Sequence, residues 1–361
     1  MSAAATLSER ASVVLLEAEE QVGYHSSGRS ATMLHYALGN PLVRALTLAS
    51  RQFIESPPER FSETPLGHTR PTLVHAREEE LPALNALAAA IAPFAKLERV
   101  GEKEILDLCP VLRVGRQGAV AALVDRNAIK LDSDALLQGF ARTLRHNGGD
   151  VVTGARVQAL NREKGAWTAV TERGDRFSAP VVVNAAGSWA DKIAQLGGVS
   201  PIGLQPKRRT IITFDGPEGV DVSAWPFVKT VGEELYFAPE SGRLFASPMD
   251  EEPSEPTDAQ PDDYEVALAA DRVERRTTIE VRRIVHKWAG LRTFAPDRKP
   301  VAGFAPDTEG FFWLAGQGGS GLQTSPAMAA IAASLIVDAP WPIADVKKDD
   351  LTPRRYVRQT A

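Results

Sequence analysis

The residues best suited to bind an electron-rich ligand lie in the segment from Gly316 to Pro326, where four of the first six residues are glycine. Glycines leave backbone amides uncovered, and a helix that follows them adds the positive end of its dipole. Gly316, Gly318 and Gly321 also match the G-x-G-x-x-G pattern of dinucleotide sites. The next acid, Asp338, follows the expected helix instead of ending a second strand, so this pattern alone does not predict a dinucleotide site. The alternative is that these glycines only let a helix and a strand pack closely.

A strand and a helix must position this loop. The apolar run 311–315 predicts a strand buried on both faces, and the alanine-rich run 327–337 predicts a helix covered by other structure. Ser325 is expected to cap that helix and Pro326 to occupy its first position, where a missing amide hydrogen costs nothing.

Glu17 is a second candidate ligand-binding residue. Residues 2–9 predict the end of a helix, and residues 12–17 predict a buried strand that ends at this acid. Together they resemble the second half of a mononucleotide-binding unit, in which the terminal acid binds ribose hydroxyls. The first half would need about a dozen residues before Met1, so we expect a start further upstream or a truncated product that binds its nucleotide badly. The alternative is an ordinary acid at a strand end.

The middle of the chain shows a different pattern. Residues 181–187 form a second strand-to-glycine junction, and short alternating strands at 209–214, 234–237 and 243–246 predict an antiparallel sheet inserted into a parallel one. The acidic run 250–258 predicts a solvated loop. Arg292 follows Gly290 where the chain returns from this insertion, and its simplest role would be a surface ion pair with Asp297.

The composition excludes several classes of protein. The 361 residues carry a net charge of −5, which argues against a nucleic-acid partner. Cys109 is the one cysteine, no His, Cys, Asp or Glu cluster has metal-ligand spacing, and no apolar run is long enough to span a membrane. We therefore expect a cytoplasmic protein without a metal site, whose chemistry belongs to a bound cofactor.

Several motifs together resemble the flavoprotein family of glycine and D-amino-acid oxidases. They are residues 23–26, 205–209, 288–292 and 311–313, with Glu17 and the glycine segments described above. The resemblance implies an α/β fold, α+β overall, in which a Rossmann-like FAD-binding domain carries an inserted antiparallel β-sheet substrate domain. It places the discontinuous FAD-binding domain at 1–75, 135–205 and 290–361, and the substrate domain at 76–134 and 206–289.

The same resemblance implies roles for individual residues. Arg209 and Arg292 would hold the substrate carboxylate with the Tyr236 hydroxyl, beside His35 and Gln323, while the α-hydrogen passes as hydride to FAD. FAD would be non-covalent, because the cysteine that carries it in some relatives is missing near 288–296. The residues implied to contact FAD are Glu17, Ser26, Gly28, Arg29, Ser30, Ala31, Val157, Ala185, Ala186, Gly187, Trp189, Gly290, Gly318, Gly319, Ser320, Gly321, Leu322, Gln323 and Thr324.

The substrate pocket departs from the branch of the family that accepts cationic side chains. Thr72 replaces the acid that follows an Arg-Pro pair, and Met33 and Leu38 replace polar residues, with Gly319 completing the pocket. A buried cation without a counter-charge would cost several kcal/mol. We therefore predict oxidation of a neutral, apolar D-amino acid.

Three questions stay open from the sequence. Oxidation of an N-methyl or other secondary amino acid, as in sarcosine oxidase, is one alternative, and a flavin-free, non-catalytic product is another. The electron acceptor could be a quinone or oxygen.

Overall fold

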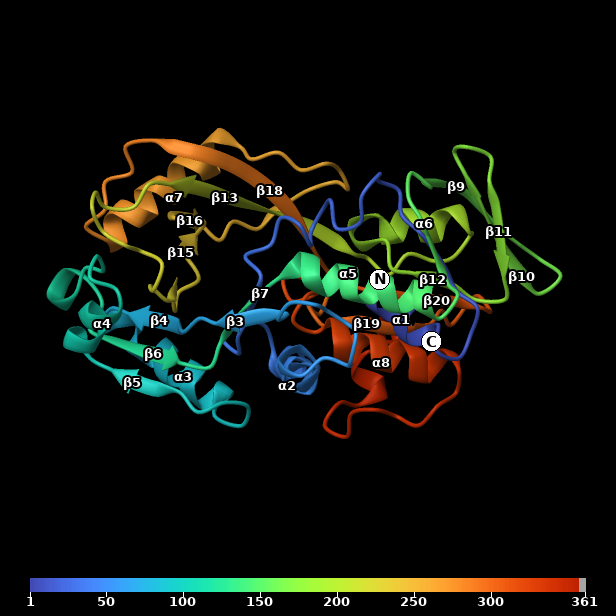
Figure 1. Cartoon of the computed structure of the whole chain (residues 1–361), viewed down its shortest axis with the longest axis horizontal. Coiled ribbons are helices and arrows are strands. Elements are labelled where there is room, and N and C mark those ends of the chain that lie inside the picture. The colour runs from blue at the N-terminus through green and yellow to red at the C-terminus, as the bar shows by residue number, and fades with distance from the viewer. Residues whose placement is uncertain (357–361) are drawn as a thin grey trace, which may run out of the picture.

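The computed structural model describes residues 1–356, arranged as two lobes that are joined by long strands (Figure 1). Its helices are α1 Ser2–Leu7, α2 Pro41–Glu55, α3 Leu81–Ile91, α4 Glu102–Leu108, α5 Ser133–His146, α6 Ala190–Leu196, α7 Asp263–Arg276 and α8 Ser325–Ile336. The sequence predictions for α1 and α8 are confirmed to within a few residues.

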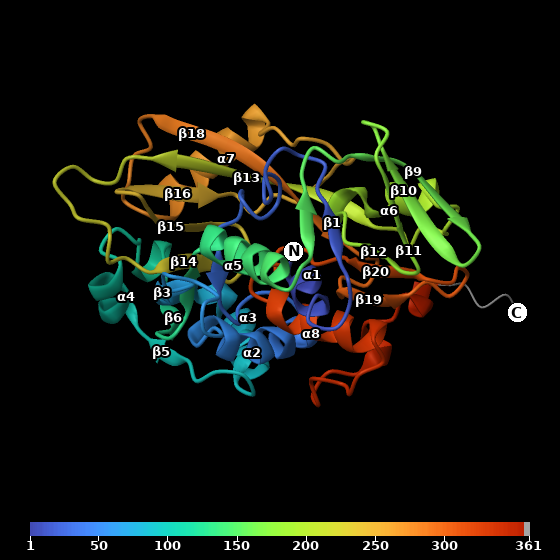
Figure 2. The same cartoon turned by 45° about the vertical axis from the view of Figure 1, so that its right-hand side comes forward.

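One lobe contains the short parallel strands of a Rossmann-like fold. β1 Val14–Leu16 pairs in parallel with β8 Asp150–Val152, and β12 Val182–Asn184 pairs in parallel with β20 Phe311–Ala315. β19 Val301–Phe304 adds an antiparallel edge to β20. The helices α1, α2 and α8 pack together beside these strands (Figures 1 and 2). A three-stranded sheet of β9 Val157–Glu163, β10 Ala166–Thr171 and β11 Arg176–Ala179 lies at the outer end of this lobe.

The predicted cap of α8 is wrong. Thr324 occupies the N-cap position without a side-chain cap, and Ser325 donates its hydroxyl to the Leu322 carbonyl. The hydroxyl of Thr324 likewise donates to the Ser320 carbonyl. Tight turns before the helix thus use these hydroxyls locally. Pro326 lies in the first turn, at the second helical position and one residue later in the helix than predicted, because the helix begins at Ser325.

The other lobe is built on one nine-stranded sheet. Its main path follows the order β17-β13-β16-β15-β14-β4-β6-β5, and β18 pairs with β13 along nearly its whole length. The bounds are β4 Thr72–Ala76, β5 Glu98–Val100, β6 Ala121–Asp125, β13 Gln205–Phe214, β14 Phe227–Thr230, β15 Tyr236–Glu240, β16 Arg243–Ser247, β17 Glu252–Pro253 and β18 Ile284–Phe294. The sheet is antiparallel as predicted except between β14 and β4, which run parallel.

Three of the proposed domain boundaries fall inside strands of this sheet. The boundary at 75/76 cuts β4, the boundary at 205/206 cuts β13 after its first residue, and the boundary at 289/290 cuts β18. A separate small sheet, β2 Met33–Leu34, β7 Ile129–Leu131 and β3 Gly67–Thr69, lies where the lobes meet.

Each face of the large sheet has a different role. One face packs against α4 and α7 through a core that includes Ile212, Phe214, Phe237 and Val273. The opposite face carries a second cluster of Met33, Ile211, Phe227, Tyr236 and Phe245. The side chains of the candidate site project from this second face.

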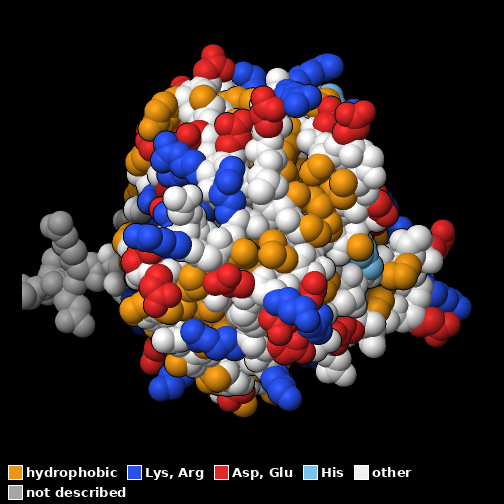
Figure 3. All heavy atoms as spheres, turned by 90° about the vertical axis from the view of Figure 1, so that its left-hand side faces the viewer, with side chains coloured by type: hydrophobic (Ala, Val, Ile, Leu, Met, Phe, Trp, Pro, Cys, Tyr) orange, Lys and Arg blue, Asp and Glu red, His pale blue; other side chains and the backbone are white. Residues whose placement is uncertain are grey.

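The outer surface is mixed in charge. On the face shown in Figure 3, Lys and Arg side chains are interspersed with Asp and Glu. That face therefore lacks the basic stripe typical of nucleic-acid binding. Among residues 1–356, no helix is long and apolar enough to cross a membrane.

Candidate active site

Arg209, Arg292 and Tyr236 come together on one face of the large sheet. Arg209 on β13 lies opposite Gly290 of β18, so alternation puts Arg292 on the same face two residues further along. The guanidinium carbon of Arg209 lies 5.8 Å from the centre of the Tyr236 ring. Two guanidinium groups beside a phenol form a site suited to a carboxylate.

Two acids of the chain contact these arginines. Arg292 Nη2 donates to Glu251 Oε1 at 2.8 Å, and Arg209 Nε donates to the Asp250 carbonyl at 2.9 Å. Asp250 also accepts from the backbone amide of Thr210. The prediction of a solvated loop is therefore wrong for Asp250 and Glu251, because the arginines draw both acids into the site. Asp297, the alternative partner of Arg292, binds Arg355 instead.

Burial and charge perturb the titration of these groups. Burial and the neighbouring Arg209 lower the pKa of Arg292 to about 10. Burial raises the pKa of Glu251, but hydrogen bonds and charge from Arg298, Arg292 and Lys207 outweigh it and bring the pKa down to about 2. Glu251 is thus a carboxylate, and Nε of Arg292 is buried without a hydrogen-bond partner among the described residues.

Lys229 is a buried cation for which the sequence gives no signal. It lies on β14 directly opposite Tyr236 and is 5% exposed. Its ammonium donates to the Ala37 carbonyl at 3.1 Å and to Glu233 Oε1 at 2.9 Å. Burial and the charges of Arg209 and Arg292 lower its pKa, whereas Glu233 raises it.

His35 and Gln323 are joined by a hydrogen bond. Gln323 Oε1 accepts from the backbone amide of His35 at 3.3 Å, and Gln323 Nε2 donates to Thr47. Burial, with the charge of Lys229, lowers the pKa of His35 to about 3, so its ring is neutral at pH 7. Nδ1 of this ring has no partner among the described residues, and the ring lies 5.5 Å from that of Phe227.

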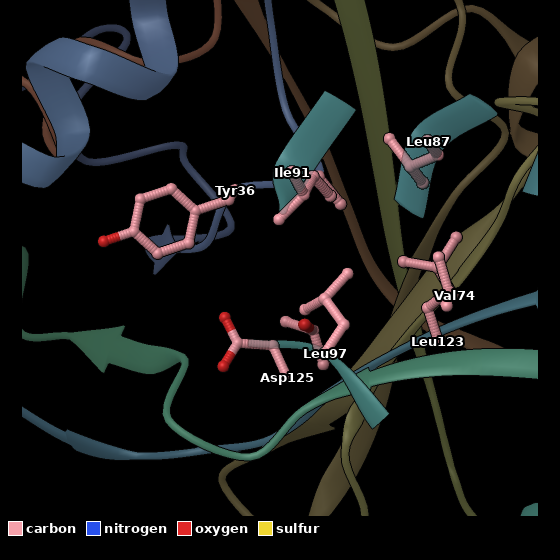
Figure 4. Close-up of a pocket in the computed structure, with 9 residues that line it drawn as sticks. Tyr36, Val74, Leu87, Ile91, Leu97, Leu123 and Asp125 are labelled. Carbon is pink, nitrogen blue, oxygen red and sulfur yellow. The ribbon is translucent and has the colours of Figure 1, made fainter. Parts of the chain in front are cut away.

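Of the predicted pocket residues, Met33 and Thr72 lie on this same face, where Thr72 pairs with Phe227. Met33 packs in the cluster with Phe227 and Tyr236, and Leu38 follows Ala37, the carbonyl partner of Lys229. Thr72 is buried and lines a small cavity. Tyr36, Val74 and Asp125 also line this cavity and are labelled in Figure 4. None of the four predicted pocket residues, Gly319 included, carries a charge.

The glycine loop touches the arginine site directly. The Gly318 amide donates to the Thr293 carbonyl at 2.9 Å, and a Cβ on Gly319 would lie 3.3 Å from Cδ of Arg292. Gly318 has a φ of +54°. Ser320, Gly321 and Leu322 continue the loop to Gln323 and Thr324, so the segment reaches both Arg292 and His35.

Several predicted cofactor residues surround a second small cavity. It is lined by His25, Ser26, Arg29, Ser188, Trp189, Thr257, Ala259, Gly290 and Leu291. Ser26 donates to the Leu291 carbonyl, and the Arg29 guanidinium donates to three carbonyls and to Asp258. The Gly28 amide closes its turn by donating a hydrogen bond to the Gly23 carbonyl. These contacts join residues 23–29 to β18.

The remaining predicted cofactor residues follow strand ends in the first lobe. Ala185, Ala186 and Gly187 follow β12, and Glu17 follows β1, where its carbonyl accepts from Ala155 near Val157. Ser30 accepts from the Thr32 amide, and the Ala31 carbonyl accepts from Lys130.

These segments fit a flavin on two observations. A Cβ added at Gly187 would meet no heavy atom within 4 Å, and Gln317 Oε1 is buried without a partner in the described chain. Cys109 is buried in the core on the opposite face of the large sheet. Within residues 1–356, no cluster of His, Cys, Asp or Glu could hold a metal ion.

Comparisons with solved structures show the fold. L-alpha-glycerophosphate oxidase from Mycoplasma pneumoniae, with FAD bound, matches at a TM-score of 0.82 and 18% identity, covering 97% of this chain and 95% of that one. Glycine oxidase from Bacillus cereus matches at 0.79 and 18%, covering 100% and 96%. L-proline dehydrogenase from P. horikoshii matches at 0.80 and 18%, covering 98% and 94%.

Sequence comparisons show the family. An uncharacterised oxidoreductase, YurR, of Bacillus subtilis is 25% identical over 67% of this chain and 63% of its own length. Glycerol-3-phosphate dehydrogenase 1 of Mycobacterium tuberculosis is 28% identical over 63% of this chain. The matched region covers 45% of that relative's own length, so this chain spans less than half of it. The family described as DAO, FAD dependent oxidoreductase, matches residues 1–335. The chain therefore belongs to the DAO family of FAD-dependent oxidoreductases, and its cofactor is FAD.

Proposed function

We propose that this chain oxidises a D-amino acid at its α-carbon, giving the corresponding 2-oxo acid and ammonia. The observation that carries this proposal is the convergence of Arg209, Arg292 and Tyr236 beside the glycine loop. Two guanidinium groups can bind an α-carboxylate by charge-assisted hydrogen bonds, each contributing about 1.5–3 kcal/mol.

The residues of the chain position the substrate and exclude water. The arginines and the Tyr236 hydroxyl hold the carboxylate, while Met33, Phe227 and Phe245 form an apolar wall. When bound, FAD supplies the acceptor for the hydride that leaves the α-carbon. The nitrogen lone pair of the neutral amine forms the C=N bond, and water then hydrolyses the imine to the 2-oxo acid and ammonia. His35 offers a neutral ring nitrogen for a hydrogen bond, but with a pKa of about 3 it is too weak a base to hold a proton at pH 7.

The pocket argues against cationic side chains. Met33, Leu38 and Thr72 provide no counter-charge, and Lys229 adds a repelling one. Substrates such as D-arginine are therefore expected to react poorly.

Flavin reduction tests the proposal. The purified chain is mixed with FAD, and its visible spectrum is recorded during anaerobic addition of D- and L-amino acids, sarcosine, glycerol 3-phosphate and 2-hydroxyglutarate. Bleaching by D-amino acids is the expected result. Bleaching only by the L-amino acids, the secondary amine or the hydroxy compounds, or failure to take up FAD, would contradict it.

A further inference from the structure

We infer that Lys229 selects a D-amino acid whose side chain carries a second carboxylate, as in D-aspartate or D-glutamate. The inference rests on the proposed function and names its substrate class. It replaces the sequence prediction of an apolar side chain, which considered Met33, Leu38 and Thr72 but not this lysine.

The sheet register places Lys229 on the substrate side. Lys229 lies opposite Tyr236, and paired residues of antiparallel strands project to the same face. Phe227, two residues earlier on β14, stacks on Tyr236 with ring centres 5.2 Å apart. Tyr236 in turn lies beside Arg209. Tyr236 therefore has two cationic neighbours: Arg209 beside its ring, and Lys229 opposite it on β14.

The ammonium of Lys229 keeps bonding capacity for a ligand. An ammonium has three donor hydrogens, and two acceptors are found for Lys229, the Ala37 carbonyl and Glu233 Oε1. The side chain of Glu233 is 62% exposed, so its carboxylate lies at the outer edge and can turn to water. A substrate carboxylate can take the third hydrogen or replace Glu233.

The charges around the pocket favour a second anion. The charges of Arg209 and Arg292 act on Lys229, and that of Arg209 acts on Arg292. Asp250, Glu251 and Glu233 lie against these cations but neutralise them only in part, because Glu251 is shared with Arg298 and Lys207. A single α-carboxylate that displaces Glu251 leaves Lys229 facing the substrate side chain. An apolar side chain there would remove water from a buried ammonium without replacing its hydrogen bond, whereas a carboxylate supplies one.

The cavity in Figure 4 adjoins this position. Ala37 lines the cavity and binds Lys229, and Val74 of the same cavity lies opposite Lys229 in the sheet. Asp125 lies at the far side, against Tyr36 and Thr72, and is 4% exposed. Burial raises the pKa of Asp125, although the Asn127 amide and Arg51 act in the opposite direction.

Binding of two unreactive acids of equal length tests the inference. Glutarate and pentanoate differ by one carboxylate and are titrated calorimetrically into the chain with saturating FAD. Glutarate is expected to bind about 10- to 100-fold more tightly, as one charged hydrogen bond predicts. In Lys229→Met the two affinities should become equal, and Lys229→Arg should retain the preference.

Lys130 provides the matched control. Its ammonium also donates to a loop carbonyl, that of Ala31 at 3.2 Å, and to a glutamate, Glu240 at 2.8 Å. Lys130→Met should leave the ratio of glutarate to pentanoate affinity unchanged. Equal binding of both acids by the unaltered chain, or an unchanged ratio in Lys229→Met, would overturn the inference.

Flavin reduction separates this inference from the proposed function. Faster reduction by D-glutamate than by D-leucine supports both. Faster reduction by D-leucine overturns only the acidic preference, and reduction by 2-hydroxyglutarate without any amino acid overturns the amine chemistry.

Discussion

Glu251 Oε1 lies 2.8 Å from Nη2 of Arg292, so a carboxylate of the chain itself occupies the guanidinium that is proposed to bind substrate. Glu251 also binds Arg298 and Lys207. With a pKa of about 2, it stays ionised over the whole working range of pH. An incoming carboxylate must therefore compete with it.

Removing that competitor should tighten substrate binding. Glu251→Gln is expected to lower KM by about two- to fivefold, because a partly exposed ion pair contributes up to roughly 1 kcal/mol. Glu265→Gln, which alters the partner of Arg208, is the control. A rise in KM would instead mean that Glu251 positions Arg292.

Substitutions of the neighbouring residues Arg208 and Arg209 on β13 should affect KM differently. Arg209→Met removes a group on the substrate face and is expected to raise KM by about 10- to 100-fold. Arg208→Met is a matched control, because its guanidinium binds Glu265 of α7 on the opposite face. Steady-state kinetics of both variants decide the point, and equal effects would contradict the assignment.

Alanine substitutions of the two central glycines of the loop should have different effects, one on stability and the other on KM. Gly318→Ala places a Cβ 2.5 Å from the Phe294 ring at a φ of +54°, and is expected to destabilise the fold by at least about 1–2 kcal/mol. Gly319→Ala only crowds Arg292, with a Cβ 3.3 Å from its Cδ, and should raise KM roughly three- to tenfold while the fold is retained. Urea unfolding and kinetics distinguish the two, and similar unfolding midpoints for both variants would refute the distinction.

His75 should make the fold sensitive to acid. Burial, aided by the charge of Arg276, lowers its pKa from 6.5 to about 3, and neither ring nitrogen has a partner among the described residues. Between pH 3 and pH 6.5 the unfolded chain therefore binds a proton at His75 that the folded chain does not. The contribution of His75 to the free energy of unfolding is complete above pH 6.5 and is lost as the pH falls towards 3. The slope from this one group is about 1.4 kcal/mol per pH unit.

His75→Leu removes that contribution. The variant is expected to lose less stability between pH 7 and pH 4 than the unaltered chain, by up to about 3 kcal/mol. Denaturant unfolding at several pH values measures the difference. Above pH 7 the two curves should run parallel, and parallel curves below pH 6 would disprove the assignment.

The sequence predicted the strand and the loop of the site better than it predicted the buried charges. The run 311–315 and the glycines after it have strong local signals, and the structure contains both the strand and the loop. Lys229 has no such signal, because a lysine between valine and threonine in a short strand is typical of a solvated edge. Its burial depends on β4 and Ala37, which are distant in sequence.

The sequence did not predict the contacts of the acids with the arginines, for a similar reason. Asp250 and Glu251 begin an acidic, proline-rich run whose composition is that of an exposed loop. Arg209 and Arg292 attract both, and the sequence spacing between acid and arginine gives no indication of that contact. Long-range charge pairing, unlike periodicity, leaves no local pattern.

β18 carries Arg292 next to Thr293, and Thr293 is bonded to Gly318 of the loop. A flavin that contacts the loop is therefore expected to hold the arginine in place as well, and by linkage FAD and the proposed substrate should each raise the affinity of the other by the same factor. The chain without its flavin should then bind the proposed amino acid more weakly, so that newly made, unloaded copies would leave that metabolite free for other enzymes.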